Sequence, residues 1–224
     1  MIEYDEQDPR MVLKLVYYGP ALSGKTTNLL CLHDQLVQDG RGELMVLDTS
    51  DDRTIFFDLL PFFIVAPSGL KIKVKVYTVP GQVKHDATRK AVLQRADGVA
   101  FIADSRLKET ANNMSSFENL EKNLAFVGID IEQIPLVVQF NKQDLSETIS
   151  AEDIEQSWGP TGIPVLRASA LQGWGVIETF RELVGRTYDH IDARFALATN
   201  HGLLKNEFID RLTRQTTPNE GMTP

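Results

Sequence analysis

Cysteine is almost absent from this chain of 224 residues, which contains only Cys31. One cysteine excludes an internal disulfide and a cysteine-based metal cluster, and it indicates a reducing, cytoplasmic environment. The four histidines show no metal-ligand spacing, so we assign none of them to a metal: His33, His85, His190 and His201. Disulfide scaffolds and zinc-finger domains are therefore excluded.

Long hydrophobic runs are also missing. The longest run, residues 59–66, is far shorter than the ~20 residues of a membrane-spanning helix, and Pro61 interrupts it. The acidic start of the sequence is not typical of a signal or transit peptide. Ile2 stands where myristoylation needs glycine, and the final residues GMTP contain no cysteine for prenylation. We expect no direct membrane anchor.

Positive charge is in deficit, with 23 Lys and Arg against 31 Asp and Glu and a net charge of −8. A surface of this sign repels nucleic acid on average, so we expect no nucleic-acid partner. The composition, 42% hydrophobic and 24% charged, is that of a globular protein and excludes disorder for most of the chain.

Strand-like and helix-like segments alternate along the chain, which predicts an α/β fold with a mostly parallel sheet. The expected strands are residues 11–18, 43–49, 62–66, 70–78, 98–103, 135–140 and 163–168. The expected helices are residues 25–37, 110–126 and 176–188, with a further helix from about Thr88. Residues 67–69 (Pro-Ser-Gly) are typical of a hairpin turn.

One expected strand carries lysines at alternate positions. Lys71, Lys73 and Lys75 alternate with Ile72, Val74 and Val76, so one face is expected in the core and the other in solvent. A basic binding patch is the alternative, and we favour the solvated face.

The chain continues beyond the expected domain, which we place at residues 1–188, into an extension of residues 189–224. Leu204, Phe208 and Leu212 are spaced as on one face of a helix, and the tail from Arg214 is polar. This apolar stripe either covers the body of the domain, which we favour, or docks an effector or a second protomer.

The strongest motif is Gly19-Pro20-Ala21-Leu22-Ser23-Gly24-Lys25-Thr26, a full match to G-x-x-x-x-G-K-[ST] between an expected strand and an expected helix. Its glycines let backbone N–H groups surround a polyphosphate at the N-terminus of the helix. Thr27, in the first turn of that helix, is expected to contribute to the same phosphate site. Lys25 is placed for the β- and γ-phosphates, and Thr26 for Mg²⁺. A chance glycine-rich turn is disfavoured by this strand–loop–helix context.

A second motif, Asn141-Lys142-Gln143-Asp144, follows the expected strand 135–140 at its carboxyl end. The Asp144 carboxylate can accept the N1–H and 2-amino donors of guanine, which adenine does not offer. Asn141 is expected to tie the loop together and the Lys142 stem to cover the base. Residues 169–171 (Ser169, Ala170 and Leu171) are expected to offer a backbone N–H to guanine O6. Alone the motif is typical of a lysine-rich turn, but with the phosphate loop it predicts GTP or GDP.

A third motif is Thr78-Val79-Pro80-Gly81-Gln82. Gly81 can bring its backbone N–H to a γ-phosphate, and Gln82 can orient the attacking water. A simple Pro-Gly turn is the alternative if this motif is taken alone.

With these motifs the chain resembles the small Ras-like GTPases, and among them the bacterial MglA family, from residue 11 to residue 188. Residues 17–28 (YYGPALSGKTTN), 51–61 (DDRTIFFDLLP) and 77–83 (YTVPGQV) carry the resemblance. It implies a P-loop small G-domain with one antiparallel hairpin strand and helices on both faces. It also implies a GTP-hydrolysing switch in cell polarity and gliding motility.

The resemblance implies that Arg53 is an arginine finger that stabilises the transferring phosphate together with Lys25 and Gln82. Thr54 is the implied second hydroxyl at Mg²⁺, and Thr49 remains an alternative. Arg53 is otherwise a solvated surface charge paired with Asp51 or Asp52. The implied partners are motility effectors and a Roadblock-type activating protein, MglB, that shifts the register of the hairpin 62–78.

Two departures from the Ras-like pattern predict slow hydrolysis. Thr78 stands where Ras-like proteins have Asp, which removes a carboxylate from around Mg²⁺. Ala21 stands where these families usually have Gly, and its methyl group crowds Gln82 or Arg53. A GTP-loaded scaffold with negligible intrinsic hydrolysis is one alternative. A P-loop kinase or ATPase with Asp104 or Asp86 as base is another, which Asp144 disfavours.

Overall fold

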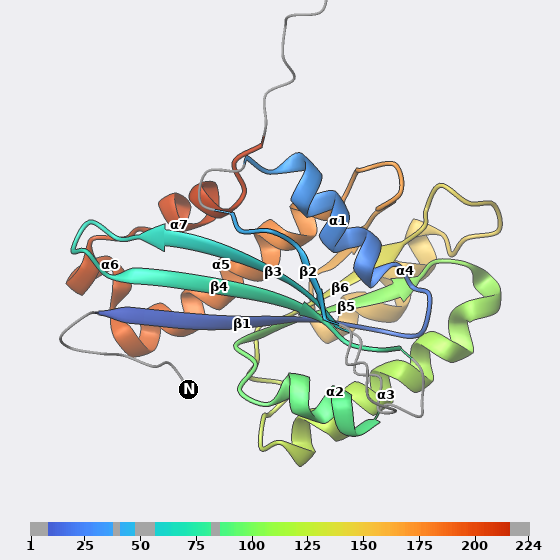
Figure 1. Ribbon diagram of the computed structural model, residues 1–224. Coiled ribbons are helices and arrows are strands. Elements are labelled where there is room, and N and C mark those ends of the chain that lie inside the picture. Colours follow the sequence, from blue (N-terminus) through green and yellow to red (C-terminus); the bar gives the residue numbers. More distant parts are fainter. Residues whose placement is uncertain (1–8, 38–40, 48–56, 82–85, 216–224) are drawn as a thin grey trace, which may run out of the picture.

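The computed structural model describes residues 9–37, 41–47, 57–81 and 86–215 (Figure 1). Its strands are β1 (Arg10–Tyr18), β2 (Met45–Leu47), β3 (Phe57–Val65), β4 (Lys71–Thr78), β5 (Gly98–Asp104), β6 (Leu136–Asn141) and β7 (Val165–Arg167). Its α-helices are α1 (Lys25–Gln35), α2 (Asp86–Leu93), α3 (Thr110–Phe126), α4 (Ala151–Trp158), α5 (Val176–Phe195), α6 (Leu197–His201) and α7 (Lys205–Leu212). Short 3-10 turns lie at η2 (Leu107–Glu109) and η3 (Gly159–Thr161).

The strands form one sheet in the order β2-β3-β4-β1-β5-β6-β7. β1 runs parallel to β4 and β5, and β6 runs parallel to β5 and β7. Only β3 among the described strands is antiparallel, to both β2 and β4. These pairings confirm the predicted mostly parallel sheet with one antiparallel strand. The continuous apolar runs of β5 and β6 are typical of parallel strands that are buried on both faces.

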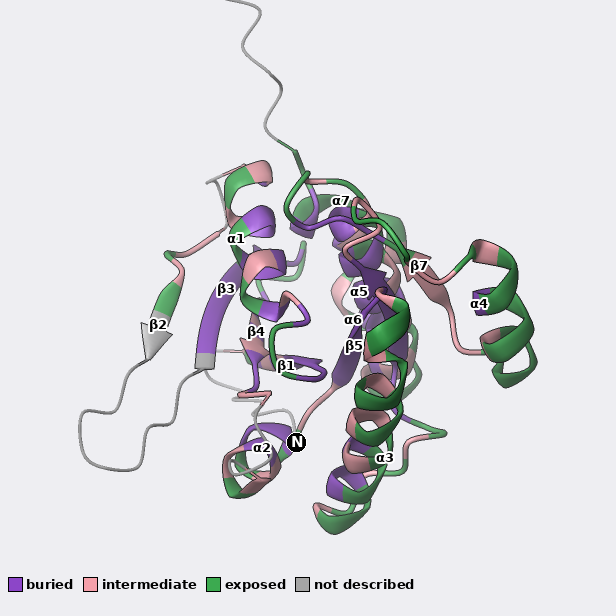
Figure 2. Cartoon of the chain, turned by 90° about the vertical axis from the view of Figure 1, so that its right-hand side faces the viewer, coloured by how far each residue is buried: buried purple, intermediate pink, exposed green. Residues whose placement is uncertain are grey.

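Helices cover both faces of the sheet, as predicted. One core cluster joins α1, α5 and α7 to one face, through residues such as Leu29, Phe180 and Phe208. The other joins α2, α3 and α4 to the opposite face, through Leu93, Leu120 and Ile154. Figure 2 shows buried residues along β3 and β5 and on one side of α1 and α5, whereas β7 is mostly of intermediate burial.

The β3–β4 hairpin has one exposed face. Ile72, Val74 and Val76 are buried, Lys71 is exposed, and Lys73 and Lys75 are half-buried, so the predicted alternation is confirmed but the lysine face is only partly solvated. In the turn, Gly69 adopts a left-handed φ of 90° and donates its N–H to Ala66 O at 2.9 Å.

β3 begins at Phe57, earlier than the predicted start at residue 62, and it runs through Pro61. A proline fits inside this strand because the pairing with β2 covers only Phe57 to Leu59. No ladder hydrogen bond to β2 is therefore lost at Pro61. Its carbonyl instead accepts the Gly42 N–H at 2.8 Å.

The extension packs on the domain. α5 continues past Tyr188 to Phe195, and α7 then packs against α5 and β3. Phe208 and Leu212 are buried as expected, but Leu204 is 60% exposed. The prediction was wrong at Leu204 because α7 begins only at Lys205, and the preceding turn buries Leu203 instead. The division at residue 188 remains a proposal, and it falls inside α5.

No helix within the described ranges combines the length and the apolar character that a bilayer crossing requires.

Candidate functional site

Four loops meet where parallel strands end. The loop of residues 19–24 follows β1, residues 79–81 follow β4, residues 142–144 follow β6, and residues 168–170 follow β7. Ligands of α/β proteins bind at this carboxyl edge of the sheet. We divide the edge into a phosphate-side group (residues 19–27 with Asp58, Thr78 and Gly81) and a base-side group (Asn141, Lys142, Asp144, Ser169 and Ala170).

The loop after β1 has an unusual backbone. Leu22 has a φ of 62° although it carries a side chain, and it is 84% exposed. Left-handed conformations of such residues cost free energy and concentrate at functional sites. Gly24 has a φ of 97°, and a Cβ there would lie 2.2 Å from Asn141 Nδ2. Glycine at position 24 therefore lets the two groups touch.

Lys25 is a buried cation, 7% exposed, at the first position of α1. Its Nζ donates to Gly19 O at 2.9 Å and to Pro20 O at 2.6 Å. Burial, with help from the nearby charges of Arg89 and Lys142 and against that of Asp58, lowers the pKa of Lys25 to about 7. A neighbouring polyanion would stabilise the charged form, so the loop fits a nucleotide phosphate.

Two threonine hydroxyls meet on one carboxylate. Thr26 Oγ1 donates to Asp58 Oδ2 at 2.6 Å, and Thr78 Oγ1 donates to the same oxygen at 3.0 Å. The three residues line a cavity of about 330 Å³ together with Thr27 and Gly81. Hydroxyl and carboxylate oxygens are the donor set that Mg²⁺ prefers, so these residues fit the expected metal.

Asp58 was missed by the sequence reasoning. The signal was present, because Asp58 is the one charged residue of β3 (FDLLPFFIV). Such a residue in an apolar strand is rarely buried without a partner.

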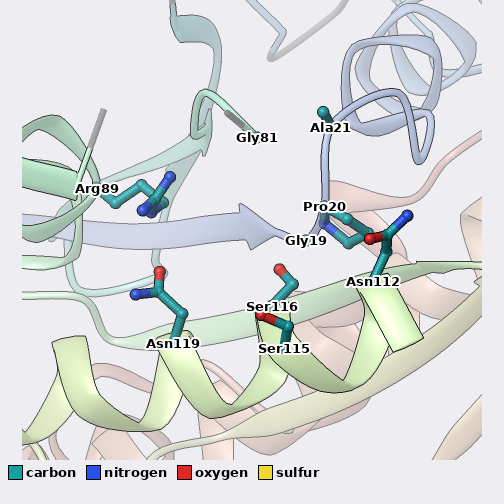
Figure 3. A pocket seen from close by; sticks show the side chains of 9 residues that line it. All are labelled: Gly19, Pro20, Ala21, Gly81, Arg89, Asn112, Ser115, Ser116 and Asn119. Atoms are coloured by element: carbon teal, nitrogen blue, oxygen red, sulfur yellow. The ribbon is translucent and has the colours of Figure 1, made fainter. Parts of the chain in front are cut away.

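The segment after β4 touches the loop after β1. A Cβ at Gly81 would lie 2.4 Å from Ala21 Cα and Ala21 N, so only glycine permits this approach. Beneath the contact lies a second cavity of about 400 Å³ (Figure 3). It is lined by Gly19, Pro20, Ala21 and Gly81, by Asn112, Ser115, Ser116 and Asn119 of α3, and by Arg89 of α2.

α2 is tied to α3 at its first residue. Asp86 Oδ1 accepts from Arg89 at 3.0 Å, from Asn119 at 3.2 Å and from Asn123 at 3.0 Å. Lys90 pairs with Asp86 Oδ2 at 2.7 Å. These donors, Lys90 foremost, hold the pKa of Asp86 well below its usual range. The described part of α2 starts at Asp86, two residues before the predicted Thr88.

Asn141 joins three loops in the base-side group. Its Nδ2 donates to Ser23 O at 2.8 Å, and its Oδ1 accepts the Ala170 N–H at 2.9 Å. Ser169 N donates to Trp174 O at 3.0 Å. Two of the three predicted backbone donors, Ser169 and Ala170, thus already have partners, and the contact of any of the three with guanine O6 stays a prediction. Leu171 is exposed at the rim.

Lys142 and Asp144 complete the group. Lys142 has a φ of 71°, and its Nζ donates to Asp104 Oδ2 at 2.6 Å. Asp144 is half-buried and accepts no hydrogen bond from the described part of the chain, so its carboxylate is available for a ligand.

Three predicted site residues, Arg53, Thr54 and Gln82, lie outside the described residues. The same holds for the alternatives Thr49, Asp51 and Asp52. Their roles stay predictions.

Comparison with known proteins agrees with this arrangement. A model of the ADP-ribosylation factor family matches residues 64–187. Over 168 residues the chain is 44% identical to "Mutual gliding-motility protein MglA" of Myxococcus xanthus (strain DK1622), a match that covers 75% of this chain and 86% of the relative. The chain belongs to the MglA family of Ras-like GTPases. A more distant relative, Ras-related protein RABA2c of Arabidopsis thaliana, is 25% identical over 143 residues, 63% of each chain.

Membership of the MglA family makes the chain a GTP-hydrolysing switch of the gliding-motility and polarity type. The structure also weakens the kinase or ATPase alternative. Burial raises the pKa of Asp104, but hydrogen bonds from Arg106 and Lys142 outweigh it and lower that pKa overall. Asp86 is engaged by four donors, so neither carboxylate is a good general base.

Proposed function

We propose that this MglA-family switch binds GTP and GDP with Mg²⁺ along the edge formed by the phosphate-side and base-side groups. The link through Asn141, from Ser23 O to Ala170 N, is the observation that carries the proposal. It fixes the distance between the residues expected to hold phosphate and those expected to hold the base.

Each residue has a role that its chemistry suits. Lys25 and the N–H groups at the start of α1 bind the phosphates, and Asp144 selects guanine by accepting two hydrogen bonds. Thr26 and Thr54 would hold Mg²⁺, which neutralises phosphate charge when bound. Gly81 donates its N–H to the γ-phosphate, Gln82 orients the attacking water, and Arg53 stabilises the transferring phosphate.

Hydrolysis by the isolated chain is expected to be slow, because Ala21 adds a methyl group where Gly81 approaches the loop. A Roadblock-type activating protein like MglB is the proposed partner. It would shift β3 and α2 so that Arg53 and Gln82 reach the phosphate. Effectors that bind the GTP state would then recruit the chain to a cell pole and set polarity or motility.

Calorimetry with GTP, GDP and ATP in the presence of Mg²⁺ tests binding, and we expect the guanine nucleotides alone to bind. Single-turnover assays test hydrolysis, with an expected rate below about 1 s⁻¹ that an activating partner raises by roughly 10³-fold or more. Absence of guanine-nucleotide binding would overturn the proposal. Binding without hydrolysis, even with the partner, would identify a GTP-loaded scaffold instead.

A further inference from the structure

Asp58 is a buried carboxylate that no predicted role explains. It is 6% exposed, and its Oδ2 accepts hydrogen bonds from the hydroxyls of Thr26 and Thr78, while its charge acts on the nearby Lys25. Taking a carboxylate out of water costs several kcal/mol of folding free energy, which hydrogen bonds and a nearby cation offset only in part. Its position at the site therefore needs an explanation other than stability.

The hydrogen bonds of Asp58 orient the hydroxyl expected at the metal. Thr26 Oγ1 uses its single proton to donate to Asp58 Oδ2, which leaves both lone pairs of that hydroxyl oxygen directed elsewhere. Hydrogen bonds of this kind fix the orientation of a metal ligand and raise its basicity. Thr26, Asp58 and Thr78 all line the same cavity, where a cation would be close to them.

Thr78 holds the carboxylate in place. Its hydroxyl donates to Asp58 Oδ2 at 3.0 Å and accepts the Asp58 N–H at 2.9 Å. The Thr78 hydroxyl is therefore hydrogen-bonded to both the backbone and the side chain of Asp58. The residue that replaces the usual Asp at the end of β4 thus positions a carboxylate on the neighbouring strand.

We propose that Asp58 supplies from the antiparallel strand the carboxylate that Thr78 removes from β4, and that it orients Thr26 toward Mg²⁺. The inference rests on the proposed binding of magnesium with the nucleotide. Asp58 acts here as a positioning residue, because it works through the Thr26 hydroxyl.

This arrangement depends on the register of β3. Leu59 pairs with Tyr77, which places Asp58 beside Thr78. A slip of two residues would carry Asp58 about 7 Å along the sheet, beyond hydrogen-bonding distance. A slip of one residue would turn its side chain to the opposite face. Strand register and magnesium affinity are therefore linked.

The test is the release rate of a fluorescent GDP analogue, measured over a magnesium titration and in excess EDTA. Asp58→Asn should raise the magnesium concentration for half-maximal slowing of release by about 10–100-fold, with the EDTA rate within about twofold of wild type. Adding Thr78→Asp to this variant should restore most of the response. Asp97→Asn is the matched control and should respond like wild type, because the Asp97 carboxylate lies before the start of β5 and accepts a hydrogen bond from Lys14 N in the middle of β1.

A wild-type magnesium response in folded Asp58→Asn overturns the inference. If that variant does not fold, Thr78→Ala replaces it, because it keeps the carboxylate and removes only its support. The half-maximal concentration should then still rise by a few-fold, and an unchanged value overturns the inference. Failure of every protein, wild type included, to bind the GDP analogue would instead refute the proposed function.

Discussion

The base-side and phosphate-side groups are built differently. The base-side group follows β6 and β7, and Asn141 has partners for both ends of its amide within the core. The phosphate-side group draws on the antiparallel β3, which leaves Phe63 and Val65 exposed, and it lies beside α2. If the proposed roles hold, base recognition draws on the parallel strands β6 and β7, and the chemistry draws on the antiparallel β3 and on α2. This is the division of labour expected of a switch.

The largest effect should come from the base-side group. Asp144→Asn replaces an acceptor pair with a donor, so GTP affinity should fall by roughly 10³-fold or more and preference should move toward xanthine nucleotides. Competition between GTP and XTP, measured by calorimetry, checks this. Glu147→Gln, in the same loop, is the control and should bind GTP normally. Unchanged GTP affinity in Asp144→Asn would contradict the role of the base-side group in selecting guanine.

Lys25→Met tests the phosphate-side group with two opposite effects. GDP affinity should fall by about 10²–10³-fold, because the contact is a buried charge pair. The ligand-free protein should become more stable, because a desolvated cation is removed. Lys122→Met, at an exposed lysine of α3, should change neither quantity.

The extra stability expected of ligand-free Lys25→Met should depend on pH in a defined direction. The pKa of Lys25 is about 7 in the folded chain and 10.5 by its ordinary value, so the unfolded chain binds more protons between them. Wild-type stability should therefore rise with pH across this interval, and the advantage of Lys25→Met should shrink. Urea unfolding near pH 6.5 and near pH 9 measures this trend. A constant advantage would contradict the burial of a titrating cation.

The smallest effect should come from Asn141, whose side chain links the phosphate-side group to the base-side group. Asn141→Ala leaves Ser23 O and Ala170 N without partners, so the free energy of unfolding should fall by about 2–4 kcal/mol. Asn112→Ala, which removes an exposed hydrogen bond to Glu109, should cost less than about 0.5 kcal/mol. Thermal or urea unfolding of the two variants compares them. Equal losses would show that Asn141 does not join the groups.

Much of this architecture could be predicted from the sequence. Apolar runs located the strands, the alternating lysines located the exposed face of β4, and Thr110 and Phe126 bounded α3 as expected. The phosphate loop could be placed because its residue spacing is fixed by local backbone geometry. Long, periodic segments carry their own signal, which is why they were found.

The two misses, α4 and Asp58, have different causes. α4 was overlooked because it buries only Ile154, so its apolar periodicity is weak; in the structure Ser150 caps its start by accepting the Asp153 N–H. Asp58 was overlooked because its partners, Thr26 and Thr78, are distant in sequence and meet only through strand pairing. Local sequence patterns do not predict contacts between residues that are distant in sequence.

The far end of the hairpin is fastened to the C-terminal helices. Arg211 Nη1 donates to Val65 O, the last residue of β3, at 2.7 Å, and Ser68 N donates to His201 O at 3.3 Å. Any sliding of β3 along its axis must break these bonds, at about 1 kcal/mol each, before Asp58 leaves Thr26. We therefore expect the C-terminal extension to resist sliding of β3. Truncating the chain before α6, which removes both hydrogen-bonding partners, should make that sliding easier.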